Sequence, residues 1–92
     1  ITEGMTVTVN EKAKAGEIIK IEVIASHKTS ITMEIFDPSG NSAESTLSCN
    51  TTKEFFCETF WVIPDDSLPG IYTIKVRDAI SSDETTFELI PN

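Results

Sequence analysis

The sequence contains few of the residues that most catalytic and cofactor sites require. It has one histidine, His27, and two cysteines, too few for a site built from several imidazole or thiolate groups. Its four glycines are scattered, so it lacks a glycine-rich phosphate loop. Seven basic residues stand against 15 acidic ones, and the net charge of −8 opposes binding to nucleic acid or to an anionic membrane surface. We therefore predict no enzyme activity, no cofactor and no nucleic-acid partner.

The chain also lacks long apolar runs and helical patterning. No stretch is apolar enough for a membrane span, and no basic segment followed by an apolar run marks a signal peptide. A chain of 92 residues makes at most one domain. Because its first residue is isoleucine and not methionine, we expect residues 1–92 to be a single domain excised from a longer, multidomain protein.

The patterned stretches are typical of β-strands. Serine and threonine make up 21 of the 92 residues, and apolar residues alternate with polar ones over short segments between turn signals. Asp37-Pro38-Ser39-Gly40, for example, fits a type I turn between two antiparallel strands. The spacing predicts an all-β fold, a seven-stranded antiparallel immunoglobulin-like β-sandwich. The predicted strands are Met5–Val9, Glu17–Ala25, Ile31–Phe36, Asn41–Leu47, Glu54–Ile63, Ile71–Asp78 and Glu84–Ile90.

The two cysteines, Cys49 and Cys57, enclose a short loop between a polar, predicted edge strand and the most apolar strand. A disulfide between them would link these strands and contribute about 2.5 kcal/mol on a chain-entropy estimate. It would also indicate an oxidising compartment. Two free buried thiols, or half of a metal site, are the alternatives. Asn50-Thr51-Thr52 is the only N-x-S/T sequon, and its place in the predicted loop makes Asn50 a candidate glycosylation site.

Acidic residues gather in two predicted turns, Asp65–Asp66 and Asp78 with Asp83–Glu84. If the last strands form a hairpin, these two groups lie at opposite ends of the sandwich. Their spacing matches no EF-hand loop. We interpret them as turn residues that accept hydrogen bonds from the backbone. Ca²⁺ is the ion that would suit such oxygens, but nothing in the spacing supports a site, and we predict no metal.

The predicted strand Glu54–Ile63 has two apolar faces, only one of which can face the core. One face carries Phe55, Cys57, Thr59, Trp61 and Ile63, and the other carries Phe56, Glu58, Phe60 and Val62. We assign the first face inward because it contains the tryptophan, the isoleucine and the cysteine. Phe56, Phe60 and Val62 then form an outward apolar patch, which is typical of an interface. The alternatives are that a loop of the same domain covers the patch or that a bulge turns Phe60 inward.

Four motifs occur in the order found in sandwich domains of bacterial and archaeal surface proteins. They are Ala15-Gly16-Glu17-Ile18, Asp37-Pro38-Ser39-Gly40, Trp61-Val62-Ile63-Pro64 and Leu68-Pro69-Gly70-Ile71-Tyr72-Thr73. Over about residues 15–90 the sequence resembles macroglobulin-type sandwich domains and, in its acidic, Thr/Ser-rich character, immunoglobulin-like repeats of archaeal S-layer proteins. Tyr72 resembles the tyrosine that closes a corner of such sandwiches. Ile74 replaces the cysteine of antibody domains, so this is not an antibody-type domain with its disulfide between the sheets.

The resemblance implies a structural role at the cell surface, with tandem modules, lattice contacts, glycosylation and sometimes Ca²⁺. On this basis we expect a non-catalytic module of an extracellular cell-surface or S-layer protein. It would act as a spacer and contact neighbouring domains of the same protein or identical subunits. The alternative is an adhesion module that binds carbohydrate or protein, for which Trp61 would have to face outward.

Overall fold

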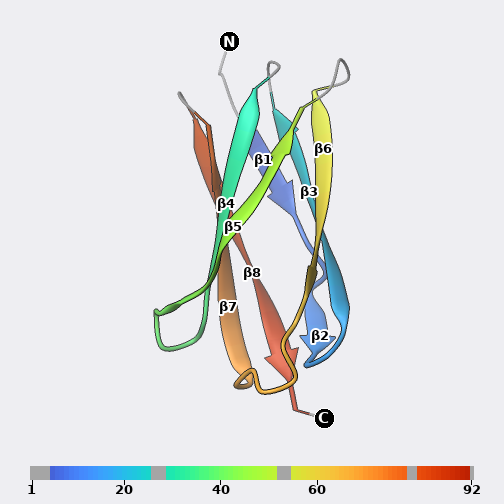
Figure 1. The fold of residues 1–92 in the computed structure, drawn as a ribbon, viewed down its shortest axis with the longest axis vertical. Coiled ribbons are helices and arrows are strands. Elements are labelled where there is room, and N and C mark those ends of the chain that lie inside the picture. The colour runs from blue at the N-terminus through green and yellow to red at the C-terminus, as the bar shows by residue number, and fades with distance from the viewer. Residues whose placement is uncertain (1–4, 26–28, 52–54, 79–80, 92) are drawn as a thin grey trace.

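The computed structural model describes residues 5–25, 29–51, 55–78 and 81–91, whose strands form a β-sandwich (Figure 1). These ranges contain no helix, and hence no helix long and apolar enough to cross a membrane. The strands are β1 (Met5–Thr8), β2 (Lys12–Lys14), β3 (Ile18–Ala25), β4 (Ser30–Phe36), β5 (Ser42–Asn50), β6 (Phe56–Val62), β7 (Gly70–Arg77) and β8 (Ser82–Ile90).

The strands are arranged in two sheets. One has three strands in the order β1-β3-β6, and the other has five in the order β2-β8-β7-β4-β5. β2 runs parallel to β8, whereas the other pairings between described strands are antiparallel. The prediction of an all-β fold is confirmed. The prediction of seven antiparallel strands is wrong, because the described chain has eight strands and its larger sheet is mixed.

The additional strand is β2, which lies in a segment that the sequence predicts to be a polar connection. Ala13 is buried, and it pairs with Leu89 of β8 between two lysines that face solvent. A strand of three residues with one buried side chain is too short to show an alternating pattern. β5 is likewise longer than predicted, because its last residues, Cys49 and Asn50, continue the pairing with β4.

The core fills the space between the sheets. Alternate residues of each strand point inward, so that β3, for example, buries Ile19, Ile21 and Val23 and exposes Lys20 between them. Burial of these side chains is the main stabilising contribution to a fold of this kind. The buried apolar residues are Met5, Val7, Ala13, Ile19, Ile21, Val23, Ala25, Ile31, Met33, Ile35, Cys57, Trp61, Ile63, Tyr72, Ile74, Val76, Phe87 and Leu89.

β6 has the orientation that the sequence predicts. Cys57, Trp61 and Ile63 are buried, and Trp61 is only 6% exposed, so this ring offers no outward binding platform. Phe55 departs from the prediction, since it is 39% exposed and precedes the strand with a φ of 61°. That left-handed conformation is uncommon for a bulky residue, and it breaks the alternation at the start of the strand.

Tyr72 closes the turn between β6 and β7 as the sequence predicts. Its hydroxyl donates a hydrogen bond to the carbonyl oxygen of Leu68 at 2.8 Å, and its ring stacks on Phe87 with centroids 5.2 Å apart. Burial is the largest effect on the hydroxyl and raises the pKa of Tyr72 above its usual value. Gly70, in the same turn, has a φ of 140°, and a Cβ there would lie 2.6 Å from Cγ of Pro38. Only glycine therefore fits between the two turns.

Candidate functional site

The outward residues of β3 and β6 form one continuous surface. The two strands pair antiparallel, and their outward residues lie opposite one another in four rows. The rows are Ile18–Val62, Lys20–Phe60, Glu22–Glu58 and Ile24–Phe56. We call these eight residues the outer face. β1 adds two threonines at its margin, Thr6 beside Ile24 and Thr8 beside Glu22.

Apolar side chains of the outer face are exposed to solvent. Ile18, Ile24, Phe60 and Val62 are 61%, 56%, 57% and 59% exposed, and Phe56 is half-buried. Of the seven large hydrophobic side chains that are exposed in the described ranges, four belong to this face. The other three are Phe55, Leu68 and Ile71. The predicted patch therefore points outward, and its role as an interface stays a prediction.

The β3 half of this surface is absent from the sequence-based prediction, although the sequence carries a signal for it. Alternation in Glu17–Ala25 assigns Ile19, Ile21 and Val23 to the core, which leaves Ile18 and Ile24 on the polar side of the strand. Isoleucine on the polar side of a strand departs from the usual alternation of a half-buried strand. The register with β6 could not be read from the sequence, because pairing of strands distant in the chain depends on the whole fold.

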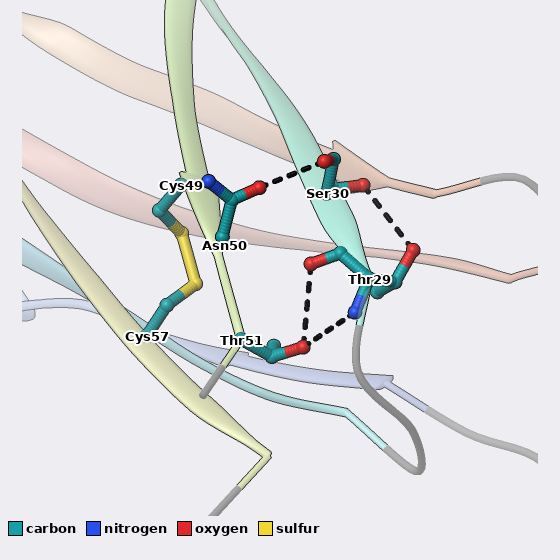
Figure 2. The surroundings of a disulfide bond; sticks show 6 residues. All are labelled: Thr29, Ser30, Cys49, Asn50, Thr51 and Cys57. Carbon is teal, nitrogen blue, oxygen red and sulfur yellow. Dashed lines mark hydrogen bonds between the residues drawn. A yellow bond between two sulfur atoms is a disulfide. The ribbon is translucent and has the colours of Figure 1, made fainter. Parts of the chain in front are cut away.

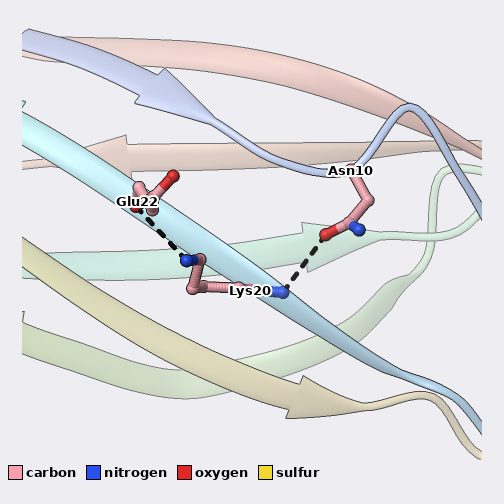
Figure 3. A network of polar contacts seen from close by, with 3 residues as sticks. All are labelled: Asn10, Lys20 and Glu22. Carbon is pink, nitrogen blue, oxygen red and sulfur yellow. Dashed lines mark hydrogen bonds and ion pairs between the residues drawn. The ribbon is translucent and has the colours of Figure 1, made fainter.

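Charged residues occupy the two middle rows. Nζ of Lys20 lies 3.6 Å from Oε2 of Glu22, and the Lys20 backbone N–H donates to Oδ1 of Asn10 at 3.4 Å (Figure 3). With side chains 46% and 36% exposed, the ion pair contributes little by itself. Glu22 and Glu58 stand opposite each other, an arrangement of like charges that destabilises an antiparallel pair. The outer face thus has apolar ends and a charged centre with one surplus negative charge.

Cys49 of β5 and Cys57 of β6 form a disulfide, with Cα atoms 6.1 Å apart (Figure 2). β5 is an edge strand of the larger sheet and β6 is an edge strand of the smaller one, so the bond joins the two sheets. This bond is not the disulfide of antibody domains, because Ile74 holds the position of that cysteine. It joins the sheets because the chain crosses from one sheet to the other between β5 and β6.

The candidate glycosylation residue, Asn50, ends β5 beside the disulfide. Its side chain is exposed, and its Oδ1 accepts a hydrogen bond from Oγ of Ser30 at 2.7 Å (Figure 2). Thr51 is buried, and its Oγ1 accepts a hydrogen bond from the N–H of Thr29 at 2.7 Å. The third sequon residue, Thr52, lies outside the described residues. Glycosylation of Asn50 stays a prediction.

Two of the carboxylates singled out in the sequence, Asp78 and Asp83, accept hydrogen bonds from backbone or turn groups. Oδ1 of Asp78 accepts hydrogen bonds from N–H and Oγ of Ser81 at 2.8 and 3.2 Å, and Oδ2 of Asp83 accepts one from the N–H of Val7 at 3.2 Å. No group of three or more His, Cys, Asp or Glu in the described ranges could hold a metal ion. His27 lies outside those ranges.

A depression of about 800 Å³ lies on the outer side of the five-stranded sheet. Lys75 lies within it, with Nζ 5.2 Å from the centroid of the Phe36 ring. In the strand register, Lys75 stands between Glu34 and Glu84. Since charges of both signs alternate across this surface, it presents no convergent set of groups for one ligand.

Comparison with known proteins gives a likeness of fold. No protein-family model and no curated protein matches the sequence. Among solved structures, the chain is similar to the superoxide reductase (neelaredoxin) of Ignicoccus hospitalis, with a TM-score of 0.62 and 8% sequence identity. The similarity covers 95% of this chain and 80% of that chain. At this identity the likeness shows the fold alone.

The match corrects the function inferred from the sequence. A sandwich shared with an enzyme gives no basis for a non-catalytic structural module of a cell-surface or S-layer protein, nor for a module of adhesion or of carbohydrate or protein binding. It also overturns the exclusion of enzyme activity. These predictions are wrong because they rest on turn motifs, such as Asp37-Pro38-Ser39-Gly40, that many sandwiches need whatever their function.

The described residues do not fit redox chemistry at a metal, however. Reduction of superoxide transfers one electron, and imidazole and thiolate are the protein ligands that suit redox iron or copper. Both cysteines are held in the disulfide, and the one histidine of the chain lies outside the described residues. We therefore adopt the fold from this comparison and derive no redox step from it.

Proposed function

We propose that the outer face is a contact surface through which two copies of the chain associate. The observation that supports this most is the exposure of Ile18, Ile24, Phe60 and Val62 on one side of two paired strands. Exposed apolar side chains that gather on one face of a small domain typically mark an interaction site.

Covering the outer face would stabilise a complex. A phenylalanine buries roughly 200 Å² when fully covered. Phe60 is 57% exposed, so a partner would remove about 110 Å² of it from water, which corresponds to at most about 3 kcal/mol. The four rows extend about 20 Å along the strands, and three strands extend about 10 Å across. This area is smaller than the roughly 800 Å² per partner of a typical stable interface, so we expect weak, concentration-dependent association.

The disulfide supports a further proposal, an extracellular location, because such bonds persist in oxidising compartments. The Tyr72–Leu68 hydrogen bond supports assignment of the sandwich to the immunoglobulin-like type, in which a tyrosine closes the same corner.

The proposal is tested by sedimentation velocity over a wide concentration range. Phe60→Ser is compared with Ile71→Ser, which removes a side chain of similar exposure, 53%, from the five-stranded sheet. We expect wild type and Ile71→Ser to self-associate equally, and Phe60→Ser to associate at least about tenfold more weakly. Far-UV circular dichroism verifies that each variant is folded, and Val62→Ser serves as a second variant of the face. Equal association of Phe60→Ser and wild type, or a wild type that stays monomeric, would refute the proposal.

A further inference from the structure

The outer face has a direction along its strands. The first row, at Ile18, and the last row, at Ile24, are apolar. Between them lie a cationic row, in which Lys20 stands beside an aromatic ring, and then an anionic row of two glutamates. When this order is reversed and laid against itself, apolar rows meet apolar rows and the cationic row meets the anionic row. A pattern of this kind is complementary to a second copy of itself turned end to end.

We infer that two copies pack face to face with antiparallel β3 strands, so that Lys20 of each copy lies between Glu22 and Glu58 of the other. The inference rests on the proposed self-association. A two-fold axis that lies between the sheets and runs across the strands produces this arrangement, and closed two-fold symmetry is the commonest for homodimers. The axis passes between the two middle rows of the outer face.

Within the described part of one copy, Glu58 lacks a cationic partner, and this arrangement supplies one. Among the described residues, Glu22 has Lys20 as its ion-pair partner, whereas Glu58, which faces Glu22, has no cation of its own. The partner's Lys20 would come between the two carboxylates and offset their repulsion. The aliphatic stems of Lys20 and Glu58 would then cover the partner's Phe60, since long charged side chains pack their stems on apolar surface.

The opposite orientation of the partner brings like charges together. If the two-fold axis ran along the strands, Glu22 would face the partner's Glu58, and this would occur twice in the dimer. Lys20 would then face only the ring of the partner's Phe60. Like charges juxtaposed in an interface are strongly unfavourable, so the antiparallel arrangement is selected.

Two reciprocal substitutions separate the arrangements. Lys20→Glu and Glu22→Lys are measured alone and together by sedimentation velocity on the full chain. Because each single change alters a net charge of −8 by two units, it is matched by a control on the five-stranded sheet, Lys75→Glu or Glu84→Lys. Circular dichroism and the fluorescence of buried Trp61 verify the fold of every variant.

In the antiparallel dimer, position 20 faces position 22 of the partner. We therefore expect Lys20→Glu to associate roughly tenfold more weakly than Lys75→Glu, and Glu22→Lys roughly tenfold more weakly than Glu84→Lys. The double variant restores opposite charges and should recover to within about threefold of wild type.

The results distinguish failure of the inference from failure of the proposed function. If Glu22→Lys associates as tightly as Glu84→Lys or more tightly, or if the double variant does not recover, the antiparallel arrangement is wrong. The contact surface itself would still stand if Phe60→Ser weakens association. If Phe60→Ser has no effect, the proposed function is wrong and the inference with it.

Discussion

The disulfide between Cys49 and Cys57 should carry a large part of the stability of this small sandwich. We consider the double variant Cys49→Ala/Cys57→Ala, which removes the bond and leaves two small apolar side chains. The cysteines are eight residues apart in the sequence. Closing a loop of this length restricts the unfolded chain by an amount that corresponds to about 2.5 kcal/mol at 25 °C. Stabilities of small domains are about 5–15 kcal/mol, so the bond supplies a sixth to a half of the total.

Urea unfolding followed by tryptophan fluorescence measures this contribution. Trp61 is buried between the sheets, so its emission should shift to longer wavelength when they separate. The free energy of unfolding should fall by about 2.5 kcal/mol, and the melting temperature by roughly 10–20 °C. Wild type under reducing conditions should behave like the double variant. Ser48→Ala, at an exposed position of the same edge strand, is the matched control and should unfold like oxidised wild type.

A small effect would contradict this reasoning. If the double variant loses less than about 0.5 kcal/mol, the bond does not restrict the unfolded chain as the loop-entropy argument requires. If it loses much more and its urea dependence also changes, the two sheets no longer unfold together without the covalent link.

Two further predictions concern the turn between β6 and β7. Because burial raises the pKa of Tyr72 in the folded state above the unfolded value near 10.0, the folded state holds this proton more tightly. The contribution of Tyr72 to stability should therefore be constant below about pH 10 and be lost as the pH rises through the folded pKa. Above pH 10 stability should fall less in Tyr72→Phe, whose free energy of unfolding at neutral pH should be about 1 kcal/mol lower because the hydrogen bond is lost. Gly70→Ala should lower the free energy of unfolding by more than about 1 kcal/mol, because the φ of 140° and the contact with Pro38 leave no room for a Cβ. Denaturant unfolding measures this loss.

Much of the fold could be predicted from the sequence because strand alternation is a local property. β3, β4 and β7 bury every second residue, and their predicted positions agree closely with the structure. β2 could not be predicted, because its pairing with β8 depends on residues more than 70 positions away. The assignment of each strand to one of the two sheets likewise depends on residues that are distant in the sequence. Consequently the disulfide pair could be named from the sequence, but not the fact that it joins the two sheets.

The candidate site was predictable in part. The outward direction of Phe60 and Val62 followed from the choice of Trp61 and Ile63 for the core. The contribution of β3 required the register with β6, which places Ile18 beside Val62 and Ile24 beside Phe56. Function was least predictable, since the motifs near Asp37 and Gly70 specify turns, and turns serve sandwiches of many functions.

The two sheets are connected along both of their long sides. On one side, residues 5–14 form β1 at the edge of the smaller sheet and then β2 at the edge of the larger sheet, so one short piece of chain crosses the gap (Figure 1). On the opposite side, the disulfide between β5 and β6 does the same. The two sheets therefore cannot separate along either side unless one of these two connections is lost. Amide hydrogens of the inner strands of both sheets should therefore exchange at one common, slow rate, as in a single cooperative unit.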